Sequence, residues 1–125
     1  MNWTPLVIGF GAVLGALGRY YLTLFWAEWR GVSFPYGTLF VNLTGAVLIG
    51  FLSIVLAQFA VPDILQHTLI VGFLGAYTTF SSYMLDAVKL FQAGKRYLSI
   101  LFGVGSPIFG FICIEFGTWL GQYLS

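Results

Sequence analysis

Two aromatic rings and several hydroxyl groups stand together in the middle of an apolar stretch, within residues 72–83. Phe80 and Tyr83 are three residues apart, so their rings lie on one face of a helix. Thr79, Ser81 and Ser82 would supply hydroxyl groups beside them. Aromatic rings are positive at their edges. The rings could be ordinary helix packing, or they could form a weak site for a small anion, as conduction requires.

A single amide, Asn42, lies deep in the second apolar stretch of the chain. Thr38 is four residues before it and Gly45 is three residues after it, so one helix face carries all three. In lipid, such an amide commonly joins helices by hydrogen bonding, which contributes about 0.6 to 2 kcal/mol. Its NH₂ group would equally serve as a donor to a passing anion, and the sequence leaves both roles open.

Two charged residues are candidates for the mouth of an ion path. Arg19 lies in the last third of the first apolar stretch. It would either snorkel to the membrane surface beside Tyr20 and Tyr21 or hold a positive charge in a water-filled vestibule, where it would concentrate anions. Asp86 follows Tyr83 by three residues, so it shares that helix face near the mouth of the third stretch.

Helices that cross a membrane must position these residues. The chain is 59% hydrophobic and 7% charged, whereas soluble domains carry about 25% charged residues. Runs of about 20 apolar residues mark membrane spans. Four fit the chain, at about Pro5–Trp26, Gly37–Ala60, His67–Phe91 and Tyr97–Tyr123. The sequence therefore predicts one multi-pass, all-α membrane domain over residues 1–125, with four transmembrane helices.

The third of these helices is predicted to be broken near its middle, because two glycines and several polar residues interrupt its apolar pattern at 72–83. Lipid offers no water to replace a lost backbone hydrogen bond, so a break there should use its freed groups for function. Glycine pairs four residues apart, Gly11 with Gly15 and Gly117 with Gly121, predict close helix packing. The sequence does not show whether these contacts lie within one chain or between chains.

Three segments resemble the small fluoride channels of the Fluc, or CrcB, family. They are Gly-Ala-Leu-Gly-Arg-Tyr at 15–20, Gly-Thr-Leu-Phe-Val-Asn at 37–42 and Gly-x-x-Gly-x-x-Thr-Thr-Phe-Ser-Ser-Tyr at 72–83. Their order and spacing cover essentially the whole chain. The resemblance implies a fluoride-selective passive channel that exports the ion down its electrochemical gradient. It also implies a place in the plasma membrane and an antiparallel, dual-topology dimer with two fluoride pores.

The resemblance assigns roles by motif position. The implied fluoride path contains Asn42, Thr79, Phe80, Ser81 and Tyr83, with Arg19 and Asp86 at the vestibule. It further implies a structural Na⁺ on the dimer axis, held by backbone carbonyls of Gly75 and Thr78 from both subunits. The family's aromatic pair is usually two phenylalanines. Tyr83 departs from this pattern, and its added hydroxyl group could itself bond fluoride or water.

The basic residues are distributed unevenly along the chain. Arg30, Lys95 and Arg96 lie in the first and third connections, whereas the two termini and the second connection carry no Lys or Arg. Cytoplasmic loops are enriched in these residues, so the asymmetry predicts both termini outside. An antiparallel homodimer needs the same chain to insert in both orientations. The partner is therefore either a second copy or a sister subunit of opposite bias.

Two other function classes fit the sequence less well. A small multidrug-type exporter also uses four helices in an antiparallel dimer, but it needs a carboxylate in the centre of the first helix, where this chain has Arg19 and no acid. A non-transporting membrane assembly subunit would need neither a broken helix nor the Asn42 face. The chain shows no nucleophile with a base and no pair of facing carboxylates, so it is not expected to be an enzyme.

Overall fold

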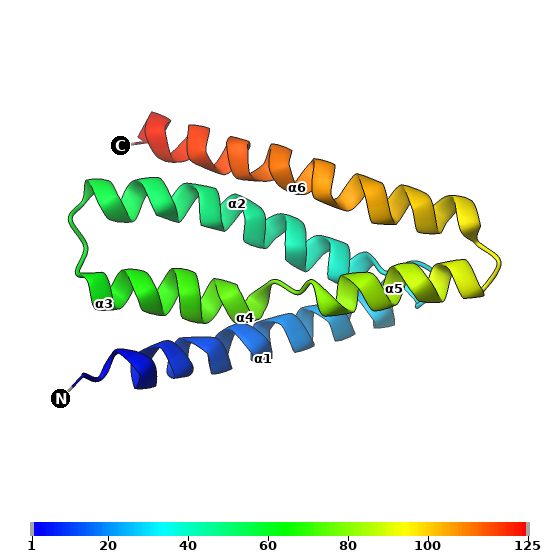
Figure 1. Cartoon of the computed structure of the whole chain (residues 1–125), viewed down its shortest axis with the longest axis horizontal. Helices are drawn as coiled ribbons and strands as arrows, with labels where there is room; N and C mark the ends of the chain where they lie inside the picture. The colour runs from blue at the N-terminus through cyan, green and yellow to red at the C-terminus, as the bar shows by residue number, and fades with distance from the viewer. Residues whose placement is uncertain (1, 125) are drawn as a thin grey trace.

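A computed structural model of the chain describes residues 2–124 and confirms the four predicted spans. They are α1 (Thr4–Arg30), α2 (Tyr36–Gln58), a third span over Asp63–Gln92, and α6 (Arg96–Leu124). Each is long and apolar enough to cross a membrane. The four spans run roughly along the long axis of the molecule, and the start of α1 and the end of α6 lie at the same end (Figure 1).

The third span is broken, as predicted. It consists of α3 (Asp63–Gln66), the π-helical segment η1 (His67–Leu74), α4 (Gly75–Tyr77) and α5 (Ser81–Gln92). The helix stops at Thr78, whose backbone is extended with φ −76° and ψ 155°. Gly72 and Gly75 still lie in helix, so the interruption falls on the polar residues that follow the glycines.

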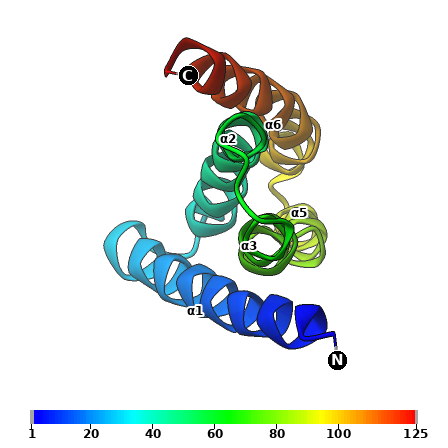
Figure 2. The same cartoon turned by 90° about the vertical axis from the view of Figure 1, so that its left-hand side faces the viewer.

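The spans pack in a fixed order across the bundle. The η1 and α4 segments lie against α1, whereas α6 lies along α2 and against α5. Seen from the end, α1 and α6 occupy opposite sides, with α2 and the third span between them (Figure 2). The broken helix is therefore held between α1 on one side and the α2–α6 pair on the other.

Glycines stand where the spans cross. A Cβ atom at Gly11 would lie 2.5 Å from the carbonyl oxygen of Thr68, and one at Gly15 would collide with the backbone of Phe73. At the other crossing, a Cβ at Gly121 would lie 2.9 Å from the Cβ of Ile54. Both predicted glycine pairs thus bring helix backbones together within this chain, which settles the alternative that the sequence left open.

The buried interior of the described chain is small. Val41 and Leu74 are fully buried and form one apolar cluster with Tyr77. Large apolar side chains are exposed along the outer faces of all four spans. This distribution suits a chain surrounded by lipid, because lipid tails are as apolar as these side chains.

Candidate functional site

Asn42 bonds directly to the backbone at the break in the third span. Its Oδ1 accepts a hydrogen bond from the amide of Thr79 at 2.8 Å, and its Nδ2 donates to the carbonyl of Thr79 at 2.8 Å. These two bonds satisfy backbone groups that the interrupted helix would leave unpaired in lipid. Asn42 therefore joins α2 to the break. One N–H of its amide group is left for another acceptor.

The hydroxyl of Thr79 supports the start of α5. Its Oγ1 accepts a hydrogen bond from the amide of Ser82 at 3.2 Å, as side-chain oxygens do at helix N-termini. In an unbroken helix the amides of Thr79 and Ser82 would serve the carbonyls of Gly75 and Thr78, four residues earlier. Both amides are bound to side chains instead, so these two carbonyls lose their usual donors.

The predicted polar face of α2 does meet the third span. Gly45 faces Thr78, because a Cβ atom at position 45 would collide with the side chain of that residue. Thr38 is buried, and its Oγ1 donates to Oδ2 of Asp86 at 2.6 Å. The sequence did not indicate this Thr38–Asp86 pair, which ties the start of α2 to α5.

The two rings lie together, as their spacing predicts. The ring centres of Phe80 and Tyr83 are 5.8 Å apart, and the two ring planes are inclined at 43° to each other. Their environments differ, because Phe80 is 74% exposed whereas Tyr83 is buried. The ring of Tyr83 also contacts Phe102 on α6, at 5.3 Å between centres. Its hydroxyl donates to the carbonyl of Gly103.

A cavity of about 400 Å³ lies at the break and brings most of the predicted site together. Its lining includes Asn42, Thr78, Thr79, Phe80, Tyr83, Ser106 and Pro107. The Oγ of Ser106 is buried and has no hydrogen-bond partner in the described chain. Sequence reasoning did not assign Ser106 to the ion path. Nothing in its spacing showed that α6 would bring this residue to the cavity at the break.

A second cavity of about 430 Å³ opens at the end of the molecule that carries Arg30, Lys95 and Arg96, the basic end. Asp86 and Thr38 line it, together with Lys89 and Lys95. The Nζ of Lys95 donates to the carbonyl of Ser33 at 3.1 Å and links the first and third connections. Asp86 thus lies in the lining of this second cavity, on the helix that follows the break.

Two predicted residues stand apart from these cavities within the described subunit. Arg19 is half-buried near the middle of α1 and lines neither of them. Ser81 is exposed next to Phe80 and also lines neither. Phe80, Ser81 and Gly75 are all exposed around the break, so this region forms an open surface of the subunit.

A family model described as "CrcB-like protein, Camphor Resistance (CrcB)" matches residues 6–118. The chain belongs to the CrcB family. A relative from Trichormus variabilis is 43% identical over 121 residues, covering 94% of this chain and 88% of that protein. One from Hydrogenobaculum sp. is 39% identical over 125 residues, covering 99% and 100%. Both relatives are named "Fluoride-specific ion channel FluC". The predicted resemblance is confirmed.

Proposed function

We propose that this chain is a subunit of a fluoride-selective passive channel and not an enzyme. The cavity at the break carries the proposal, because it combines two aromatic rings with the Asn42 amide and an unpartnered Ser106 hydroxyl. Relatives of the chain are named fluoride-specific ion channels. Fluoride is small and strongly hydrated, so a path for it must replace water with donors and polarised ring edges.

The proposed path runs past groups that bind the ion weakly. The free N–H of Asn42 and the hydroxyl of Ser106 would donate to fluoride, and the edges of Phe80 and Tyr83 would face it. Thr79 lines the same cavity, and Ser81 follows Phe80 on the open surface. None of these groups carries a full charge, so the ion is stabilised without being trapped, as conduction requires.

The active form in this proposal is an antiparallel dimer with one pore per subunit. Phe80 is 74% exposed, and a ring that lines a pore needs a wall on its open side. A partner subunit packed on the surface around the break would supply that wall and would cover Gly75 and Ser81. The partner is a second copy of this chain or a sister subunit.

A structural Na⁺ between the two subunits fits the residues at the break. Hard cations bind oxygen ligands. The described residues contain no cluster of three His, Cys, Asp or Glu that could hold a metal. The carbonyls of Gly75 and Thr78 have lost their helical donors, because Thr79 and Ser82 donate to side chains. These two carbonyls, contributed by both subunits, would hold the ion and join the dimer.

Charged side chains beside the path would guide the ion. Arg19 would raise the local anion concentration in a vestibule that only the assembled dimer encloses. Asp86 borders the cavity at the basic end beside Lys89 and Lys95. An anion gains about 2.3 kcal/mol per 100 mV on leaving a cell with a negative interior. Export across the plasma membrane would therefore need no coupled reaction.

Ion efflux from liposomes tests the proposal. The purified chain is reconstituted, and fluoride and chloride release are recorded with ion-selective electrodes. We expect rapid fluoride release with negligible chloride release. Exchange of a drug cation for protons would instead indicate a multidrug-type exporter. Silence both from this chain alone and after co-expression with a sister subunit would overturn the proposal.

A further inference from the structure

A proline leaves one backbone carbonyl of α6 without its helical donor. Pro107 lies inside α6, which runs from Arg96 to Leu124. Proline has no N–H group, so it cannot donate to the carbonyl four residues before it, which is that of Gly103. An unpaired carbonyl in the interior of a membrane protein is costly, because no bulk water is present to bond it.

The hydroxyl of Tyr83 donates to this same carbonyl of Gly103. Tyr83 is buried, and both its ring and Pro107 line the cavity at the break. We infer that Pro107 and Gly103 are positioning residues for the aromatic pair. The carbonyl freed by Pro107 binds the hydroxyl of Tyr83 and fixes its ring against α6.

This inference rests on the proposed function and changes what Tyr83 offers to the ion. The phenolic proton is committed to the Gly103 carbonyl, so it is not available to fluoride. The remaining lone pairs of the hydroxyl oxygen would repel an anion. Tyr83 therefore presents its ring edge to the path, as a phenylalanine would, but in an orientation held by α6. Phe80 is exposed and has no hydroxyl group, so no comparable hydrogen bond fixes the orientation of its ring.

A double-mutant cycle in unfolding tests the coupling without relying on transport. The variants are Tyr83→Phe, Pro107→Ala and the double substitution, unfolded in mixed detergent micelles. With Pro107 present, Tyr83→Phe orphans the carbonyl, and we expect the unfolding equilibrium constant to rise about tenfold. In the Pro107→Ala background, a backbone amide is again available to the Gly103 carbonyl. There Tyr83→Phe should raise the unfolding equilibrium constant by clearly less than tenfold. Tyr97→Phe is the control, because this tyrosine of α6 is 77% exposed.

Fluoride and chloride efflux of the same variants then separates positioning from direct contact. We expect Tyr83→Phe to slow fluoride release but to keep the fluoride-to-chloride ratio within about twofold, since no donor to the anion is lost. Equal costs of Tyr83→Phe in both backgrounds, or a collapse of the ion ratio, would overturn the inference. If the wild-type chain releases no fluoride, the proposed function fails, but the unfolding cycle still decides whether Pro107 and Tyr83 are coupled.

Discussion

Several polar side chains at the break are hydrogen-bonded to backbone groups. These bonds use part of the capacity that the side chains would otherwise offer to an ion. Asn42 uses its oxygen and one N–H on Thr79, and the hydroxyl of Tyr83 is bound to Gly103. Ser106 differs, because its buried hydroxyl has no partner within the described residues. The groups that remain for an anion are therefore one amide N–H of Asn42, the ring edges and hydroxyl groups that include those of Ser106 and of Thr79, whose oxygen accepts a bond without using its proton.

Replacing Asn42 with alanine should destabilise the subunit by about 2 to 4 kcal/mol. The change leaves the N–H and the carbonyl of Thr79 unpaired, and each unpaired buried group costs about 1 to 3 kcal/mol. Unfolding in mixed detergent micelles measures the effect. Ser53→Ala on the same helix is the control, because the Ser53 hydroxyl bonds only within α2. Equal stability of Asn42→Ala and Ser53→Ala would show that the Asn42 bonds contribute little.

At the scale of elements, the broken third span depends on close approach to its neighbours. Gly11 and Gly15 let the backbone of α1 reach η1, which carries the segment that precedes the break. On α2, the absence of a side chain at Gly45 leaves space for the side chain of Thr78. Because these contacts lie on both sides of the third span, the half that precedes the break is held in a fixed relation to the cavity.

A pair of glycine substitutions in α1 tests this arrangement. Gly15→Ala places a Cβ against the backbone of Phe73, which cannot move aside as a side chain would. We expect a loss of about 1 to 3 kcal/mol in stability, as for other overpacked interiors, together with reduced fluoride release. Gly9→Ala is the matched control, because no atom from outside its own stretch of helix lies within 4 Å of the added Cβ. It should be neutral or gain up to about 1 kcal/mol from helix propensity. Similar losses from both changes would contradict the close crossing.

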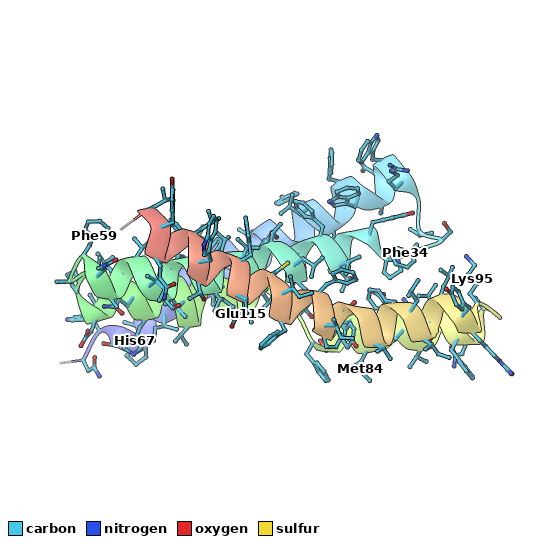
Figure 3. The ribbon with its side chains drawn as sticks, turned by 90° about the horizontal axis from the view of Figure 1, so that it is seen from above. Phe34, Phe59, His67, Met84, Lys95 and Glu115 are labelled. Carbon is cyan, nitrogen blue, oxygen red and sulfur yellow. The ribbon has the colours of Figure 1, made fainter. Side chains whose placement is uncertain are left out.

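The whole molecule has a basic end and an end without Lys or Arg. Lys95 and Phe34 lie at the end opposite Phe59 and His67 (Figure 3). Arg30 ends α1 and Arg96 begins α6, which places both at the Lys95 end. Such a polarity favours one orientation in the membrane, with the basic end on the cytoplasmic side.

Cysteine labelling in intact cells measures this orientation. Cys113, the single cysteine, is first replaced by serine. Ser33→Cys then marks the basic end, and Phe59→Cys marks the other; both positions are exposed. We expect an impermeant maleimide to label Phe59→Cys and to leave Ser33→Cys largely protected, which would favour pairing with a sister subunit. Comparable labelling at both positions would show that the chain inserts both ways, as an antiparallel homodimer needs.

Features that depend on local composition could be predicted without any structure. Apolar runs located the four spans, and the polar residues at 78–82 interrupted the third. The spacing of Phe80 and Tyr83 placed their rings together, and it did so correctly because three residues nearly complete one helical turn. The family followed from the same short segments and is confirmed by its relatives.

The partner that each polar group takes depends on how the helices pack against one another. The Thr38–Asp86 bond, the Asn42–Thr79 pair and the Tyr83–Gly103 contact each join two different spans. Each requires a particular rotation and shift of one helix against another. Local periodicity fixes the face of a helix but not the residue that stands opposite it. For this reason the sequence located the break and the rings, whereas the hydroxyl of Ser106 and the anchor of Tyr83 emerged only from the packed helices.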